Sequence, residues 1–326
     1  MSLCYKLENK VINPSTKRNR QMRIALIGQA AFGKDVLSAL LDANENVVAA
    51  LCPPDIPNRS PDPVKDLAIS ANIPVFQYSR MRDSQAIKQF LSLEIDLCVM
   101  AFVTDIVPNQ ILKSPKLGTI QYHPSLLPEH RGPSSMNWPI IQGKNKTGLT
   151  IFWPDEGLDT GPILLQKETE IAPDETLGSL YFQKLYPIGI ESIIESINMV
   201  REGTAPRIEQ DHSKASYEGW CQSENAIINW GKTAGQIYNL IRGCDPSPGA
   251  NTKIQGCPIS FFKASISPTQ YESTPGTVVE ISDNWFKISA MQGSINVGRV
   301  QLKGNPKVMA DEFIQTNKLR IGDTFG

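Results

Sequence analysis

The length and charge of the chain limit the classes of protein to which it can belong. Its 326 residues are enough for two domains of ordinary size. A content of 40% hydrophobic and 20% charged residues is typical of a soluble protein, and no apolar run approaches membrane-spanning length. The 32 basic and 33 acidic side chains leave a formal net charge of −1, which does not favour a nucleic-acid or membrane-surface partner.

The cysteines and histidines argue against a metal or disulfide framework. The six cysteines are scattered without a Cys-x-x-Cys pair, a pattern that suits free thiols in a reducing cytoplasm. The three histidines are His123, His130 and His212, so we expect no histidine-rich metal site. We therefore expect a cytoplasmic protein that has no metal and no membrane partner.

The first 21 residues differ from the rest of the chain. They contain five basic residues and little apolar sequence, so they lack the apolar core of a secretory signal. We interpret residues 1–21 as a disordered extension, or as sequence upstream of a start at Met22. A transit peptide is an alternative.

An α/β pattern follows. Residues 23–27 predict a buried strand, 33–43 a helix and 47–51 a second strand, which favours a doubly wound fold. Gly28, Gly33 and Lys34 have the spacing of a phosphate-binding loop. The Ser or Thr that should follow the lysine is Asp35, whose carboxylate would repel phosphate. We therefore predict that these glycines serve tight packing between strand and helix.

The elements up to residue 115 continue this pattern. A proline-rich loop at 52–63 is followed by expected helices at 64–71, 84–93 and 109–112, and by strands at 73–76 and 97–102. The loop at 103–108 leaves the central strand 97–102.

The stretch from Gly118 to Gln166 contains two residues of chemical interest. His123 ends a β-type run at 119–122, and Pro124 favours an extended backbone at the histidine. Asp159 lies in a glycine-containing loop that follows a β run at 149–153. A histidine at a strand end is commonly structural, but with the aspartate it predicts a general acid/base pair in which the carboxylate orients the imidazole.

Two motifs decide between these roles. Residues 122–128 read Tyr-His-Pro-Ser-Leu-Leu-Pro and residues 155–161 read Asp-Glu-Gly-Leu-Asp-Thr-Gly. In order and spacing they closely resemble the folate-dependent formyltransferase family, which includes methionyl-tRNA formyltransferase and the amino-terminal hydrolase domain of 10-formyltetrahydrofolate dehydrogenase. Segments 130–138 and 151–153 resemble the hydrolase-domain version more than the tRNA enzyme. One position departs from the family pattern. Two residues before the histidine, where the family has Asn, this chain has Gln121, whose side-chain amide is one methylene longer.

The resemblance implies a site and a substrate. It implies 10-formyltetrahydrofolate as the formyl donor, with His123 and Gln121 stabilising the oxyanion and Asp159 setting the charge of the imidazole and helping to deprotonate the nucleophile. His123 would also donate a proton to the leaving nitrogen. The pterin ring would be held by the loops at 103–108 and 153–159. The residues implied for folate binding are Phe102, Asp105, Val107, Ser125, Leu126, Trp153, Asp155 and Gly157.

The remainder of the chain predicts a second domain. A helical pattern at 176–202 and a linker at 216–230 precede a helix at 233–241, several short strands and a closing helix at 310–315. We expect a Rossmann-like α/β formyltransferase domain at 22–215 and a small OB-like β-barrel at 216–326. The expected strands of the barrel are 259–264, 277–281, 285–290, 294–297 and 300–302.

The sequence leaves the formyl acceptor open. Water would give formate and tetrahydrofolate, whereas a small amine would give a formylated product. Methionyl-tRNA and amino sugars are alternative acceptors, although the loop at 52–63 offers only Arg59 to a nucleic acid. A non-catalytic folate-binding regulatory module is the alternative from a different class.

Overall fold

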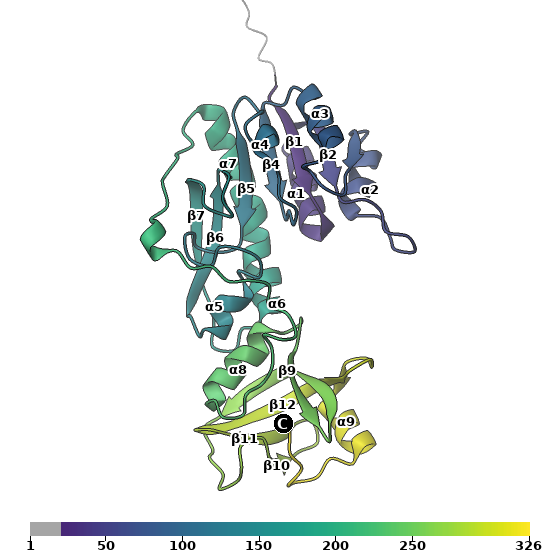
Figure 1. Ribbon diagram of the computed structural model, residues 1–326, viewed down its shortest axis with the longest axis vertical. Helices are drawn as coiled ribbons and strands as arrows, with labels where there is room; N and C mark the ends of the chain where they lie inside the picture. Colours follow the sequence, from purple (N-terminus) through teal and green to yellow (C-terminus); the bar gives the residue numbers. More distant parts are fainter. Residues whose placement is uncertain (1–20) are drawn as a thin grey trace, which may run out of the picture.

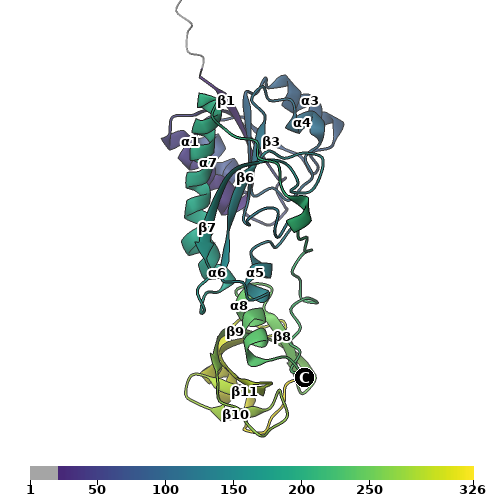
Figure 2. The same ribbon diagram turned by 90° about the vertical axis from the view of Figure 1, so that its left-hand side faces the viewer.

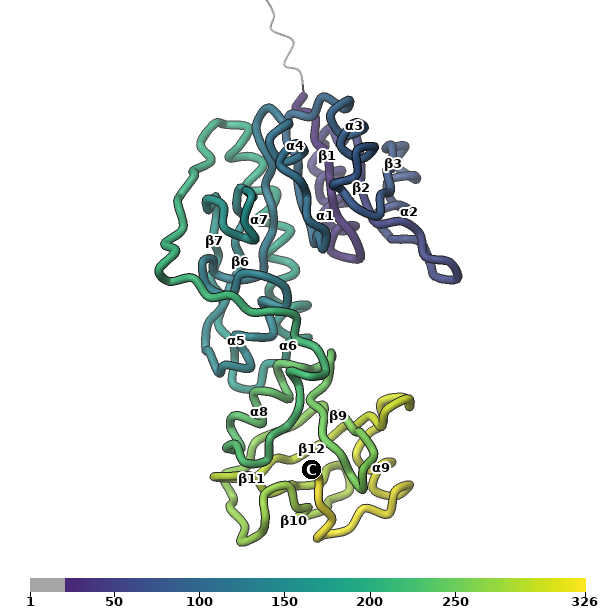
Figure 3. The backbone as a smooth tube through the Cα atoms, viewed as in Figure 1, coloured from purple at the N-terminus to yellow at the C-terminus, as the bar shows by residue number. Residues whose placement is uncertain are grey.

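Two β-sheets organise the computed structural model, which describes residues 21–326 (Figures 1 and 3). The first has seven strands in the order β3-β2-β1-β4-β5-β6-β7. The strands are β1 (Arg23–Gly28), β2 (Asn46–Cys52), β3 (Val75–Gln77), β4 (Leu97–Ala101), β5 (Thr119–His123), β6 (Lys146–Phe152) and β7 (Ile163–Glu170). Strands β1 to β5 are all parallel and follow the Rossmann order 3-2-1-4-5. Strand β6 runs antiparallel to its two neighbours, β5 and β7. The first 20 residues of the expected extension lie outside the described residues.

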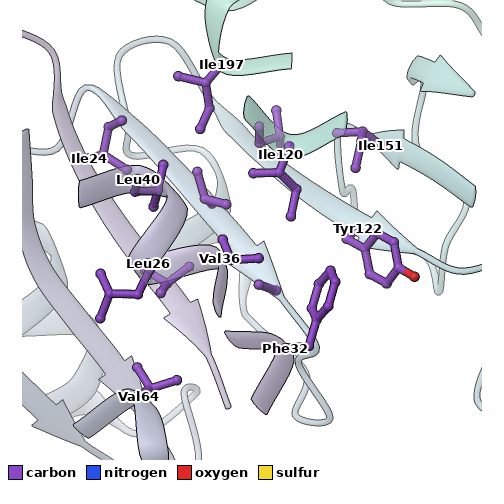
Figure 4. Close-up of a cluster of buried hydrophobic side chains, with 14 of the residues drawn as sticks. Ile24, Leu26, Phe32, Val36, Leu40, Val64, Ile120, Tyr122, Ile151 and Ile197 are labelled. Carbon is purple, nitrogen blue, oxygen red and sulfur yellow. The ribbon is translucent and has the colours of Figure 1, made fainter. Parts of the chain in front are cut away.

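Helices cover both faces of this sheet (Figure 2). Helices α1 (Ala30–Asp42), α2 (Pro63–Ser70) and α7 (Tyr186–Glu202) pack on one face, and α3 (Ser84–Ser92) and α4 (Asn109–Leu112) on the other. Apolar residues of α1 meet those of β5 and α7 in one buried cluster (Figure 4). Burial of apolar surface stabilises the folded state by about 25 cal/mol per Å². The three-layer core therefore fixes the strands whose ends build the site.

The glycines of the first β–α turn pack as predicted. A Cβ on Gly33 would lie 3.1 Å from the carbonyl carbon of Gly28, and one on Gly28 would lie 2.9 Å from the Ala101 oxygen. Lys34 pairs with Asp35 at 3.1 Å. This turn brings strand and helix close together, which is the packing role expected for these glycines.

Some elements differ from the predicted ones. The sequence pattern predicts no strand between residues 153 and 176, but the structure has β7 at Ile163–Glu170, because an edge strand tolerates a run of alternating charged residues. Helix α5 (Asn137–Ile141) was not predicted. The predicted helix at 176–202 is divided into α6 (Leu177–Leu180), a π-helical turn (Tyr181–Leu185) and α7, which has Pro187 in its first turn.

The second sheet forms the barrel. Its strands are β8 (Ala250–Ile254), β9 (Cys257–Ser267), β10 (Val278–Ile281), β11 (Phe286–Ala290), β12 (Gly293–Leu302) and β13 (Val308–Met309). They follow the order β10-β11-β12-β9-β8, with β13 beside β12. Thr324 bridges Thr277 and Phe325 bridges Ile254, so the last residues join β10 to β8. The Phe325 ring stacks on Phe286 at 5.7 Å. The barrel prediction is confirmed.

Two details of the barrel were not predicted. The expected strands at 294–297 and 300–302 are one strand, β12, which passes through Gly298. A Cβ at Gly298 would lie 3.0 Å from the Lys263 oxygen of β9, so the glycine permits a close approach of the two strands. Strand β8 was also absent from the expectation. Helices α8 (Ala234–Gly243) and α9 (Ala310–Asn317) match the predicted ones within two residues at each end.

The two domains meet where α5 packs on α8. The Asn137 side chain donates to the Gly243 carbonyl at 2.9 Å, and Arg242 donates to the carbonyls of Ala172 and Glu175. The predicted boundary at 215/216 falls in a segment that contacts the first domain as far as Cys221, whereas the second core begins with Ala226. Among the described helices, including the short 3₁₀ turn His212–Lys214, none is long and apolar enough to cross a membrane.

Candidate active site

A cavity of about 590 Å³ lies where the loops after β4, β5 and β6 converge; we call it the His123 cavity. Its volume is in the range of small-molecule sites. The loop after β4, residues 102–109, forms one part of its wall, and residues 132–136 and 154–159 form others. Gln121, His123 and Trp220 also line it. The cavity is therefore built at the ends of three neighbouring strands and completed by Trp220.

The alternation of β5 explains why Gln121 and His123 face the cavity. Successive side chains of a strand point to opposite faces of a sheet. Ile120 and Tyr122 belong to the buried cluster under α1 and α7 (Figure 4). Gln121 and His123 must then point to the other face, so the structure brings together two of the three predicted catalytic residues.

His123 and Asp159 lie side by side in a buried environment. The exposed fractions of the two residues are 5% and 6%, and His123 Nδ1 is 3.7 Å from Asp159 Oδ2. The His123 Nε2 atom lies 2.9 Å from the His130 carbonyl oxygen. A carbonyl only accepts, so Nε2 carries a hydrogen and donates it. Nδ1 is consequently the ring nitrogen that faces Asp159 and is available for proton exchange.

The backbone around Asp159 is held in an uncommon conformation. Asp159 has a φ of +56°, which is in the left-handed region, and its Oδ2 accepts the Gly132 N–H at 2.8 Å. Its loop is also packed tightly, since a Cβ at Gly161 would lie 1.8 Å from the Trp153 oxygen. The Asp-Glu-Gly-Leu-Asp-Thr-Gly motif thus requires glycine at its end for steric reasons.

Gln210 and Arg131 support this arrangement and were not predicted. The Gln210 side-chain amide donates to the carbonyls of Asp159 and Gly161 at 3.0 and 2.7 Å. Its oxygen accepts from Arg131 Nε and Nη2 at 3.2 and 2.7 Å. Arg131 lies between the His130 carbonyl, which holds His123, and the Gly132 N–H, which holds Asp159. One buried network therefore positions both members of the pair.

Five of the residues implied for folate binding line the His123 cavity. They are Phe102, Asp105, Val107, Asp155 and Gly157. Asp105 accepts the Met81 N–H at 2.6 Å, and Asp155 accepts from the Gly157 N–H and the Thr160 hydroxyl. Both carboxylates thus also shape their own loops.

The other three do not line the cavity. Ser125 is fully buried and donates to the Glu129 carbonyl at 2.7 Å. Leu126 packs beside Gly148, where an added Cβ would lie 2.6 Å from its Cδ2. Trp153 is in the core and donates to the Pro206 carbonyl. Because these side chains are used inside the protein, they support the loops of the site from behind.

Trp220 is a further feature that the sequence did not indicate. Its residue is 57% exposed although it lines the cavity. Both flanks are fixed to the first domain, since the Trp138 indole donates to the Gly219 carbonyl and the Cys221 N–H donates to the Ser134 hydroxyl, at 2.9 and 3.0 Å. The linker therefore presents a large aromatic ring at the cavity.

The charges of the lining are of one sign. Asp105, Asp155, Glu156 and Asp159 line the His123 cavity, and none of its described lining residues is Lys or Arg. Glu156 is 3.4 Å from exposed Lys113 outside the lining. No group of three or more possible metal ligands occurs within residues 21–326. The lining favours neutral or cationic reactants over a phosphate beside His123.

Family comparisons agree with this geometry. The Formyl transferase family matches residues 22–190, and its C-terminal domain matches residues 221–318. The chain belongs to the formyltransferase family. Human mitochondrial 10-formyltetrahydrofolate dehydrogenase is 40% identical over 316 residues, covering 92% of this chain and 34% of that protein. Methionyl-tRNA formyltransferase from Trichlorobacter lovleyi is 36% identical, covering 92% of this chain and 96% of that protein.

The chain spans between 27% and 34% of the length of the curated dehydrogenases that it matches. Solved structures share its fold. HypX from Aquifex aeolicus in complex with tetrahydrofolic acid has a TM-score of 0.65 at 17% identity, covering 90% of this chain and 47% of that one. An N-formyltransferase from Helicobacter canadensis with folinic acid and dTDP-3-aminofucose has a TM-score of 0.65 at 20% identity, covering 85% of this chain and 99% of that one.

Proposed function

We propose that this formyltransferase-family chain binds 10-formyltetrahydrofolate in the His123 cavity and releases its formyl group, either to water or to a small amine. The buried His123–Asp159 pair, which lines a cavity of suitable size together with Gln121, carries the proposal. With water, the C–N10 bond breaks and the products are formate and tetrahydrofolate. With an amine, the products are a formylated amine and tetrahydrofolate.

The geometry suggests a role for each side chain. Attack on the formyl carbon gives a tetrahedral intermediate whose oxygen is negative, and the Gln121 amide can donate to that oxygen. His123 Nδ1 exchanges the proton, because Nε2–H is already donated to the His130 carbonyl. The Asp159 carboxylate beside Nδ1 stabilises the protonated imidazole that then delivers a proton to N10. Phe102, Asp105, Val107, Asp155 and Gly157 would contact the folate.

The lining of the cavity favours water or a simple amine as the acceptor. A nucleotide-linked amino sugar would bring a diphosphate, and the described lining has four carboxylates and no Lys or Arg. Repulsion between a diphosphate and these carboxylates is strong where water is partly excluded. We therefore place hydrolysis or transfer to a non-phosphorylated amine first.

The product assay is the deciding experiment. Purified protein is incubated with 10-formyltetrahydrofolate, with and without candidate amines, while tetrahydrofolate, free formate and formylated amine are measured. Tetrahydrofolate and formate in equal amounts without an amine support hydrolysis. A formylated product that replaces formate supports transfer. Folate binding without tetrahydrofolate release would leave only the non-catalytic folate-binding module.

Gln121 is expected to influence the choice of nucleophile. Compared with the family's Asn, its extra methylene moves the amide by roughly one C–C bond, about 1.5 Å, and a displacement of that order can cost about 10²-fold in rate. We predict that Gln121→Asn raises amine transfer relative to hydrolysis, whereas Gln121→Ile retains measurable hydrolysis. Both products are measured for each variant at matched folate saturation. An unchanged ratio in Gln121→Asn would show that this residue does not select the nucleophile.

Methionyl-tRNA formylation is the second candidate, because the bacterial methionyl-tRNA formyltransferase aligns over nearly the whole of both chains. The loop between β2 and α2 argues against it. The one basic residue of this loop is Arg59. Its two carboxylates serve the structure, since Asp55 pairs with Lys65 and Asp62 caps α2. We predict weak binding to initiator tRNA at physiological salt. Sub-micromolar affinity with a steep salt dependence, in a filter-binding or anisotropy titration, would reverse the order of the two candidates.

A further inference from the structure

Two cysteines lie together where the linker meets the second domain. The Sγ atoms of Cys221 and Cys244 are 3.9 Å apart. Cys221 follows Trp220 in the linker, and Cys244 follows the last residue of α8, Gly243. Formation of an S–S bond of about 2.05 Å would require the sulfurs to approach by roughly 2 Å.

The two thiols differ in a way that suits stepwise oxidation. Cys244 is fully buried, whereas Cys221 is partly exposed. The hydrogen bond from the Cys244 thiol holds the pKa of Cys221 below its usual value, while that bond and burial raise the pKa of Cys244. The accessible sulfur is thus the one that more readily becomes a thiolate, the form that attacks disulfides.

The other described cysteines have no such arrangement. Burial raises the pKa of Cys52 to about 11 and that of Cys98 to about 12, and both lie in the first domain. Cys257 is exposed. Among the described cysteines, only Cys221 and Cys244 form a sulfur–sulfur contact.

We propose that Cys221 and Cys244 form a redox-modification site that reacts with small disulfides such as oxidised glutathione. The Cys221 thiolate attacks one sulfur of the reagent, forms a mixed disulfide and releases one thiolate. Cys244 then gives up its proton, attacks the Cys221 sulfur and releases the second thiolate. Two protein thiols are oxidised to one disulfide, and the reagent is reduced to two thiols that take up the two protons.

The location gives the modification a structural consequence. The Cys221 N–H donates to the Ser134 hydroxyl, and both Ser134 and the neighbouring Trp220 line the His123 cavity. Next to Cys244, the Gly243 carbonyl accepts from Asn137 at the domain junction. A disulfide would therefore link the segment that carries Trp220 covalently to the end of α8.

The experiment uses the full chain with Cys4→Ser and Cys257→Ser, which leaves four cysteines. The protein is exposed to oxidised glutathione, quenched with acid and analysed by intact mass, peptide mapping and thiol titration after unfolding. We expect a product two hydrogen atoms lighter, a Cys221–Cys244 peptide, and a fall from four titratable thiols to two. Dithiothreitol should restore all four.

Single variants test the order of the steps. Cys244→Ser should accumulate the glutathione adduct at Cys221, because the resolving thiol is missing. Cys221→Ser should form neither the adduct nor the closed product. A stable glutathione adduct at Cys221 with Cys244 intact, or absence of reaction while circular dichroism shows a folded protein, would overturn the proposal. The readouts are chemical, so they stand apart from the outcome of the formyl-release assay.

Discussion

His123→Ala should lower kcat for formyl release by about 10²–10⁴-fold, the usual contribution of a general acid/base group. The dissociation constant for folate should change by less than about fivefold, because His123 acts mainly when charge develops in the transition state. The reason lies in the geometry: His123 lines the cavity with its Nδ1 beside Asp159, and alanine leaves no group there to move a proton. Initial rates of tetrahydrofolate formation and a folate-binding titration measure the two quantities.

His212→Ala is the matched control. His212 is also a histidine, but it is exposed and does not line the His123 cavity. Its ring contacts Arg131 at 3.0 Å, so a small effect through the supporting network is expected, well below tenfold. If His123→Ala kept more than about a tenth of the wild-type kcat, its assignment as the proton-transfer group would be wrong.

Asp159→Asn should give the second large loss, of roughly 10²–10³-fold in kcat, similar to the loss on removing one oxyanion-stabilising donor. Asparagine tolerates the left-handed backbone at this position, and its oxygen can still accept the Gly132 N–H. The substitution therefore removes the negative charge beside His123 with little change in shape. Steady-state kinetics of both products, with thermal unfolding to check stability, measure the effect.

Glu156→Gln controls for the loss of one negative charge from the same loop. Glu156 lines the cavity, but its carboxylate is exposed and pairs with Lys113 rather than with His123. Its effect should stay within a few-fold, since exposed ion pairs contribute about 0–1 kcal/mol. Equal losses in the two variants would indicate that the overall charge of the cavity matters, and not the position of Asp159.

The sequence predicted Gln121, His123 and Asp159 as the catalytic residues from short, local motifs, and all three line the His123 cavity. Alternation along β5 puts Gln121 and His123 on one face, and the glycine-rich loop that follows β6 contains Asp159. The parallel strands could also be predicted, since strands buried on both faces are continuous apolar runs. Local patterns of this kind are visible without knowing which segments meet in space.

The supporting residues could not be predicted in this way. Gln210 contacts Arg131, 79 positions earlier in the chain, and a polar pair of such separation leaves no periodic signal. Trp220 resembles any exposed aromatic residue of a linker until the cavity is seen beside it. Strand β7 was missed because its outer half is charged, which is typical of an edge strand and also of a helix surface.

The closure of the barrel by Thr324 and Phe325 has a consequence for the order of events during synthesis. Domains usually fold from the amino terminus as the chain emerges at roughly 5–20 residues per second. The strands of the first sheet end at Glu170, and Trp220 supplies the last segment of the His123 cavity, so both can assemble while later residues are still being translated. The barrel can join β10 to β8 only after its final residues leave the ribosomal tunnel. On the ribosome, the His123 cavity should therefore form before the carboxy-terminal barrel is closed.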